Sequence, residues 1–148
     1  MIRAPKPDEF AALSDLCLRS KAYWGYDDAF MAACRDELTV TPEDIEDGDF
    51  GVLDVDGSIA GVVYVTCTDD VADLDLLYVD PAFMGAGYGV RLFQWALDVA
   101  RRRGANRITI DADPNAKSFY EHMGARLIGE SPSGSIPGRL LPLLEYHL

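Results

Sequence analysis

The chain has 148 residues and a formal net charge of −12, with 25 acidic against 13 basic side chains. Its length fits one domain over residues 1–148, with a single core that needs no disulfides. A nucleic-acid partner is not expected, because binding to phosphates relies on an excess of basic side chains.

The cysteines and the apolar residues point to a cytoplasmic protein. Cys17, Cys34 and Cys67 are odd in number and widely spaced, which is typical of thiols in a reducing compartment and not of a metal site. No apolar run approaches the roughly twenty residues that cross a bilayer, and the first residues do not have the shape of a signal peptide. We therefore expect neither a membrane nor a metal.

Apolar spacing and turn residues divide the first half of the chain into two helices and a hairpin. Phe10, Leu13, Leu16 and Cys17 recur at helical spacing, and Asp56-Gly57 is typical of a two-residue hairpin turn. The expected elements are a strand at 2–4, a helix capped by Asp8, a break at 23–26, a helix from Asp28 to about Leu38, a turn at Thr41-Pro42, and strands at 50–55 and 59–68.

The second half of the chain predicts a long amphipathic helix between two strands, followed by a shorter helix and further strands. The apolar stripe of the long helix consists of Leu92, Phe93, Ala96, Val99 and Ala100. The expected elements are a strand at 74–79, a helix at 87–103 ended by Gly104, a strand at 108–112, a helix at 116–123, and strands at 127–129 and 139–146.

Three glycines at alternate positions, Gly85, Gly87 and Gly89, stand between the strand at 74–79 and the long helix. Such a turn leaves backbone N–H groups uncovered where a helix begins, and these can bind a phosphate. The alternative is a tight connection that needs glycine only for its dihedral angles. A Walker loop is excluded because Val-Arg follows the last glycine, and the spacing departs from the Gly-x-Gly-x-x-Gly of dinucleotide-binding turns.

Three motifs stand in an order that resembles one known family: Val79-Asp-Pro81, Met84-Gly-Ala-Gly-Tyr-Gly89 and Asn115-Ala-Lys-Ser-Phe-Tyr-Glu-His-Met-Gly124. The chain resembles the GNAT superfamily of acyl-CoA-dependent N-acetyltransferases. It departs from the family at Met84, where relatives carry glutamine or arginine. The resemblance implies an α/β (α+β) fold with a central mixed, mostly antiparallel sheet of six to seven strands and helices on both faces.

The resemblance also implies that the chain binds acetyl-CoA. The pyrophosphate is expected on the glycine turn, and the pantetheine arm beside the preceding strand. Asn115 is expected to cap the helix that follows it, to bind the pantetheine arm, or both. The residues expected to contact the cofactor are Leu77, Tyr78, Val79, Met84, Gly85, Ala86, Gly87, Tyr88, Gly89, Val90, Asn115 and Tyr120.

Transfer of an acyl group from a thioester to an amine needs a positioned neutral amine, a stabilised oxyanion and a proton for the leaving thiolate. The resemblance makes Tyr120 the expected general acid, since a phenol stays protonated at neutral pH. The alternative is that Tyr120 only packs under the sheet. Asp75 is the candidate base, directly or through a water, because its strand leads into the cofactor site. An amine that is already neutral needs no base.

We expect the acceptor to be a small-molecule amine bound by Trp24, Tyr26 and Arg139. The two aromatic side chains offer a flat surface, and a guanidinium can bind a carboxylate such as that of an amino acid. The alternatives are that the aromatic side chains form core or dimer contacts and that Arg139 points into solvent.

Other functions stay open beside this one. A catalytically silent acyl-CoA sensor of the same fold would keep the glycine turn and lose Tyr120. A protein or peptide N-acetyltransferase would share the cofactor site, and an interaction domain would bind a basic partner through the acidic residues 1–56. A homodimer is the assembly that we expect.

Overall fold

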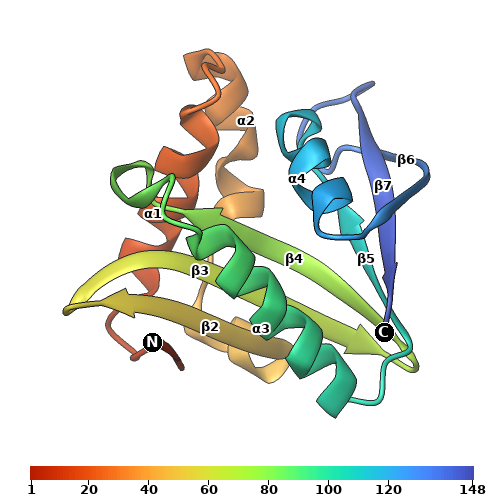
Figure 1. Ribbon diagram of the computed structural model, residues 1–148. Helices are drawn as coiled ribbons and strands as arrows, with labels where there is room; N and C mark the ends of the chain where they lie inside the picture. Colours follow the sequence, from red (N-terminus) through yellow and green to blue (C-terminus); the bar gives the residue numbers. More distant parts are fainter.

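Seven strands form a single sheet in the computed structural model, which describes all 148 residues (Figure 1). The strands are β1 (Ile2–Arg3), β2 (Gly48–Val55), β3 (Ser58–Thr68), β4 (Val71–Val79), β5 (Arg107–Asp111), β6 (Arg126–Pro132) and β7 (Leu140–His147). Their order across the sheet is β1-β2-β3-β4-β5-β7-β6. All neighbours are antiparallel except β4 and β5, which confirms the predicted mixed, mostly antiparallel sheet.

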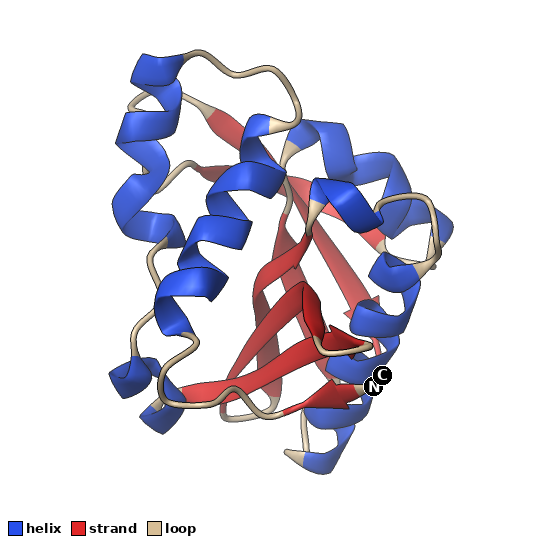
Figure 2. Cartoon of the chain, turned by 90° about the vertical axis from the view of Figure 1, so that its left-hand side faces the viewer, coloured by secondary structure: helices blue, strands red, loops and turns tan.

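Helices lie on both faces of this sheet, as predicted (Figure 2). They are α1 (Phe10–Ala22), α2 (Asp28–Leu38), α3 (Tyr88–Arg102) and α4 (Lys117–His122), with short 3-10 helices at Pro42–Glu46, Pro81–Phe83 and Pro114–Ala116. α1 and α2 cover one face, and α3 and α4 cover the other (Figure 1). None of the helices has the length and the apolar composition that a membrane crossing requires.

Two clusters of buried side chains fill the spaces between the sheet and the helices. All five residues of the apolar stripe predicted for the long helix lie in the cluster under α3 and α4. The four residues at helical spacing in the first helix lie in the cluster under α1 and α2. β2, β3 and β4 are therefore buried on both faces, whereas β6 at the edge of the sheet is largely exposed. The helix residues in both clusters include those whose spacing in the sequence predicted a buried face.

Three local predictions were wrong. Glu9, and not Asp8, occupies the N-cap of α1, although its carboxylate binds Arg3 at 2.8 Å and makes no cap bond. Asn115 does not cap α4, because it lies within the preceding 3-10 helix and Ala116 occupies the N-cap. β4 begins at Val71 and not at Leu74, because its first three residues pair with β3 on one side and β5 on the other.

The sheet opens into a wedge between β4 and β5. The two strands pair only at Val71–Asp73 with Arg107–Thr109, after which β4 continues for six residues without a partner on that side. The register with β3 shifts between Leu74 and Leu76, so Asp75 is the extra residue of a β-bulge. The unpaired edge of β4 therefore turns free backbone N–H and C=O groups toward the wedge.

Candidate active site

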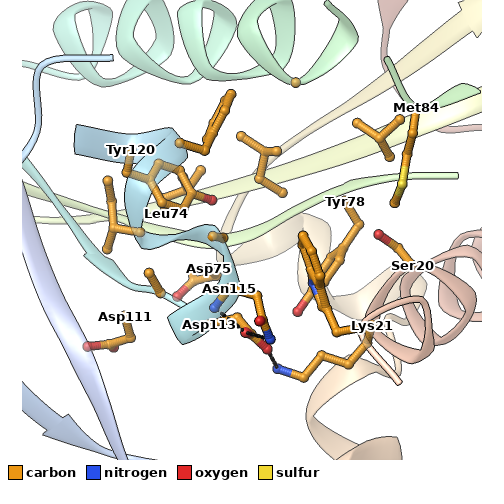
Figure 3. A pocket seen from close by; sticks show the side chains of 18 residues that line it. Ser20, Lys21, Leu74, Asp75, Tyr78, Met84, Asp111, Asp113, Asn115 and Tyr120 are labelled. Atoms are coloured by element: carbon orange, nitrogen blue, oxygen red, sulfur yellow. Dashed lines mark hydrogen bonds and ion pairs between the residues drawn. The ribbon is translucent and has the colours of Figure 1, made fainter. Parts of the chain in front are cut away.

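A pocket of about 270 Å³ occupies the wedge between β4 and β5 (Figure 3). Its walls come from the second half of β4 and from residues 110–113 at the end of β5. Ser20, Lys21 and Trp24 border it from α1 and the turn after it, and residues 115–120 border it from the segment leading into α4. Parts of the chain that are about ninety residues apart thus meet around one cavity.

Much of the predicted cofactor site lies around this pocket. Leu77, Tyr78, Val79, Met84, Gly89, Asn115 and Tyr120 line it. The remaining residues of that prediction, Gly85, Ala86, Gly87, Tyr88 and Val90, lie in the adjoining turn and the first turn of α3. An extended group could pair with the backbone of β4 along this pocket, because that edge of the strand has no strand partner beyond Asp73.

The glycine turn needs glycine for its backbone. Gly85 and Gly87 have φ angles of 88° and 80°, in the left-handed region that costs other residues about 1–2 kcal/mol. Gly87 is also the N-cap of α3, so the first N–H groups of that helix point out of the turn without a side chain over them. Such an arrangement suits a phosphate, because the helix dipole adds positive charge at the same place.

Tyr120 projects from α4 into the pocket, and its hydroxyl points toward the interior (Figure 3). The residue is only 6% exposed, and its ring packs edge-on against Phe93. No group of the protein forms a hydrogen bond with the hydroxyl, so it is left for a ligand or for water. Burial raises the pKa of Tyr120 above its usual value, which keeps the hydroxyl protonated and able to donate.

Asp75 lies at the β4 bulge and lines the same pocket. Its carboxylate accepts a hydrogen bond of 2.6 Å from the Thr66 hydroxyl. Partial burial, together with the negative charges of Asp73 and Asp111, raises the pKa of Asp75 above its usual value. A carboxylate with a raised pKa takes up a proton more readily, which is the property that a general base needs.

The carboxylate of Asp113 is the centre of a polar network that was not predicted from the sequence (Figure 3). It accepts hydrogen bonds from Lys21 Nζ at 2.8 Å, from the Tyr26 hydroxyl at 2.8 Å and from Asn115 Nδ2 at 3.0 Å. Arg139 donates to the Tyr26 hydroxyl at 2.8 Å and lies 3.9 Å from the carboxylate. The network ties α1, the end of β5 and the β6–β7 loop together at one end of the pocket.

One signal for this network was present in the sequence. Lys21 follows Cys17 by four residues, so it lies on the buried stripe of α1 and is only 9% exposed. A lysine on an apolar stripe needs an anionic partner, because burial of an unpaired charge is costly. The partner is Asp113, which is 92 residues away and follows no periodic pattern.

The structure changes the interpretation of Arg139. Its side chain does not point into solvent but lies over the rings of Tyr26 and Phe30, at 5.3 and 4.8 Å from their centres. Because its guanidinium is already engaged by Tyr26 and Asp113, an acceptor carboxylate would have to compete with these partners. Trp24 lines the pocket and is 44% exposed. The roles of Trp24, Tyr26 and Arg139 in binding the acceptor stay predictions.

Replacement of Asp113 by alanine is expected to destabilise the fold by about 3 kcal/mol, because Lys21 would remain buried without its counter-ion. Hydrogen bonds from Lys21 and from the Asn115 N–H lower the pKa of Asp113 against the opposing effect of burial. The stabilisation is therefore present above about pH 4 and is lost as the pH falls through the lowered pKa. Urea denaturation at several pH values measures both effects.

The matched control for this prediction is Asp15→Ala. Asp15 is exposed on α1 and forms neither a hydrogen bond nor an ion pair, so its loss should change the free energy of unfolding by less than about 0.5 kcal/mol. Equal effects of the two substitutions would show that the Lys21–Asp113 pair does not hold the pocket wall.

Comparison with known proteins decides the family. Residues 18–125 match the model of the acetyltransferase (GNAT) family, which covers the pocket walls, the glycine turn and Tyr120. The chain belongs to the GNAT family. The predicted resemblance is thereby confirmed.

Two curated acetyltransferases are similar in sequence to part of this chain. An uncharacterized N-acetyltransferase of Methanocaldococcus jannaschii is 32% identical over 89 residues, which cover 53% of this chain and 39% of that protein. A mycothiol acetyltransferase of Beutenbergia cavernae is 31% identical over 88 residues, covering 57% and 30% respectively. The chain thus spans less than half the length of the curated relatives that it matches.

Solved structures share the fold of this GNAT chain over its whole length. The PaiA N-acetyltransferase of Thermoplasma acidophilum, solved in complex with coenzyme A, superimposes with a TM-score of 0.80 at 16% identity and covers 100% of this chain and 98% of that one. YncA of Salmonella typhimurium, a putative acetyltransferase solved with acetyl-CoA, gives a TM-score of 0.70 at 19% identity, with coverages of 99% and 92%.

Proposed function

We propose that this GNAT chain transfers the acetyl group of acetyl-CoA directly to the amine of a small molecule. The observation that carries the proposal is the pocket between β4 and β5, where the unpaired edge of β4, the glycine turn and the Tyr120 hydroxyl meet. The wedge, the turn and the family membership all fit coenzyme A, whose pyrophosphate and pantetheine arm need an anion site and a strand edge.

Each part of the pocket has a role in this proposal. The N–H groups of the glycine turn bind the pyrophosphate, and the free backbone groups of Leu77–Val79 pair with the pantetheine arm. Backbone N–H groups at the β4 bulge stabilise the negative charge that develops on the carbonyl oxygen. Acetyl-CoA supplies the activated acetyl group, and the chain contributes position and charge stabilisation.

Tyr120 acts as the general acid and donates its proton to the thiolate that leaves. A general acid stops working when it loses its proton, so kcat should decline as the pH rises through the pKa of that acid. Burial raises the pKa of Tyr120, which moves this decline to higher pH. With an amine held at saturation, we expect kcat to show no decline up to about pH 10. A decline centred near pH 8 that persists in Tyr120→Phe would belong to another acid and would overturn this assignment.

Asp75 accepts the proton of the amine, directly or through a water. Its place in the pocket and its raised pKa support this role. The alternative is an amine that arrives neutral and needs no base. Loss of the rise in kcat/KM with pH in Asp75→Asn would support the base, whereas an unchanged pH profile in that variant would support the alternative.

A calorimetric titration with acetyl-CoA, followed by an acetylation screen of amines and amino acids, tests the proposed function. We expect heat of binding for acetyl-CoA and N-acetylation of at least one small amine. Binding without acetylation of any amine would favour the acyl-CoA sensor, and acetylation of peptides alone would favour a protein or peptide N-acetyltransferase. Absence of binding would reject the whole proposal.

We also propose that the chain forms a homodimer in the cytoplasm. β6 is one of the two edge strands of the sheet, and its apolar residues Leu127 and Ile128 are 47% and 48% exposed. An edge strand with apolar side chains favours pairing with another chain. Three free cysteines support a reducing compartment. Sedimentation of the protein with and without Ile128→Lys checks the dimer.

A further inference from the structure

A second cavity, of about 70 Å³, adjoins the wedge on the side of the sheet that α1 and α2 cover. Cys34, Glu37 and Leu38 of α2 border it on one side, and Arg139 and Leu141 border it on the other. The residues that line both cavities are Lys21, Asp75, Tyr78, Asp111 and Asp113. The second cavity therefore extends the wedge toward α2.

The side chain of Tyr78 lies where the two cavities meet. Successive side chains of β4 point to opposite faces of the sheet, and Leu77 and Val79 pack on the cluster under α3 and α4. Tyr78 packs on the cluster under α1 and α2 instead. Tyr120 belongs to the cluster under α3 and α4, so the two tyrosines enter the pocket from opposite faces of the sheet (Figure 3).

The hydroxyl of Tyr78 has no hydrogen-bond partner in the protein, although the side chain is half-buried. Every fully enclosed polar side-chain atom of the structure does have a partner, so this hydroxyl must be open to the cavities that Tyr78 lines. Two carboxylates of the second cavity are engaged elsewhere, since Glu37 accepts a hydrogen bond from Ser135 and Asp113 accepts one from Lys21. The partner of the Tyr78 hydroxyl is therefore a ligand or water.

The Tyr78 hydroxyl is suited to bind an uncharged amine. Burial raises the pKa of Tyr78 well above its usual value, and the negative charges of Glu37 and Asp113 act in the same direction. A phenol that stays protonated can accept a hydrogen bond from an N–H group through its oxygen. An attacking amine needs its lone pair for the acetyl carbon, so its N–H groups are the part that the protein can hold.

We propose that the Tyr78 hydroxyl oxygen accepts a hydrogen bond from the attacking amine and so directs the lone pair of that amine at the acetyl carbon. This rests on the proposed acetyl transfer, with acetyl-CoA along β4 and the amine entering from the second cavity. The C–N bond forms at the acetyl carbon while the C–S bond breaks. The thiolate takes the Tyr120 proton, the surplus proton of the nitrogen goes to Asp75 or to water, and Tyr78 keeps its own proton.

Two CoA analogues test this contact without turnover. In both, the CoA sulfur carries a methylene group followed by a carbonyl group, which continues as the N-butyl amide in one analogue and as the butyl ester in the other. They differ only at the atom that stands for the attacking nitrogen, which is an N–H group in the amide and an oxygen in the ester. We expect the parent protein to bind the amide about tenfold more tightly, because only the amide can donate to Tyr78.

Tyr78→Phe should remove this preference, with about tenfold weaker binding of the amide and a change of less than about twofold for the ester. The free energy of unfolding should stay the same, because the hydroxyl has no partner in the protein. The control is Tyr146→Phe, which removes a hydroxyl that lines neither cavity and should keep the preference. An amide preference that is absent from the parent or survives in Tyr78→Phe, or equal losses for both analogues, would overturn the proposal.

Acetylation assays on the same variants separate this proposal from the proposed function. If Tyr78→Phe removes the amide preference but the parent acetylates no amine, the proposed function fails while the contact stands. If the parent acetylates an amine and the amide preference survives in Tyr78→Phe, the contact fails while the function stands. If neither analogue binds to the folded parent, both proposals fail.

Discussion

Replacement of Tyr120 by phenylalanine is expected to lower kcat about a hundredfold while the Kd of acetyl-CoA changes by less than about twofold. The hydroxyl acts on charge that develops during the reaction, so its removal affects the transition state more than the bound cofactor. It makes no hydrogen bond to the protein, so the fold should lose no stability. Rates under conditions where chemistry limits turnover, together with calorimetry, measure these effects.

The control variant is Tyr146→Phe. Tyr120 and Tyr146 both pack edge-on against Phe93, with ring centres at 5.7 and 5.8 Å, but only Tyr120 lines the pocket. Tyr146→Phe should keep the parent rate. If Tyr120→Phe also keeps it, Tyr120 is a packing residue and another group must protonate the thiolate.

Replacement of Gly87 by valine is expected to weaken acetyl-CoA binding by at least about tenfold. The φ of Gly87 is 80°, and a Cβ placed there would meet no atom within 4 Å. The loss would therefore come from the backbone, which must leave the left-handed region and carry the N–H groups of the turn with it. Titration of the folded variant with acetyl-CoA measures the effect.

Gly57 supplies a matched control, because its φ is 87° and its Cβ would also meet no atom within 4 Å. Gly57→Val should cost similar stability, yet it lies in the β2–β3 hairpin and should leave acetyl-CoA affinity unchanged. Equal affinities for the two variants would mean that the glycine turn serves only as a tight connection.

The parts of this fold that depend on local pattern were predictable from the sequence. α2 begins and ends at the predicted residues, and the apolar stripe of α3 is buried as expected, because side-chain periodicity decides both. The turn before α3 was predictable from its glycines, since glycine adopts the positive φ angles of Gly85 and Gly87 without strain. The first cap was missed because Glu9 binds Arg3, a tertiary contact that overrides the preference of Asp8 for the cap.

The parts of the site that depend on distant contacts were not predictable. The bulge at Asp75 arises from the register with β3, and the start of β4 at Val71 arises from pairing with β5. Asp113 gathers side chains from positions 21, 26, 115 and 139, and no spacing rule connects them.

The most direct test of direct acetyl transfer follows two products in one incubation of the protein with acetyl-CoA and a panel of small amines. Free CoA thiol and N-acetylated amine are measured together. We expect them to appear in equal amounts, only when an amine is present, and far more slowly with Tyr120→Phe. Release of CoA without an N-acetylated amine, or no release from folded protein that binds acetyl-CoA, would contradict transfer to a small amine.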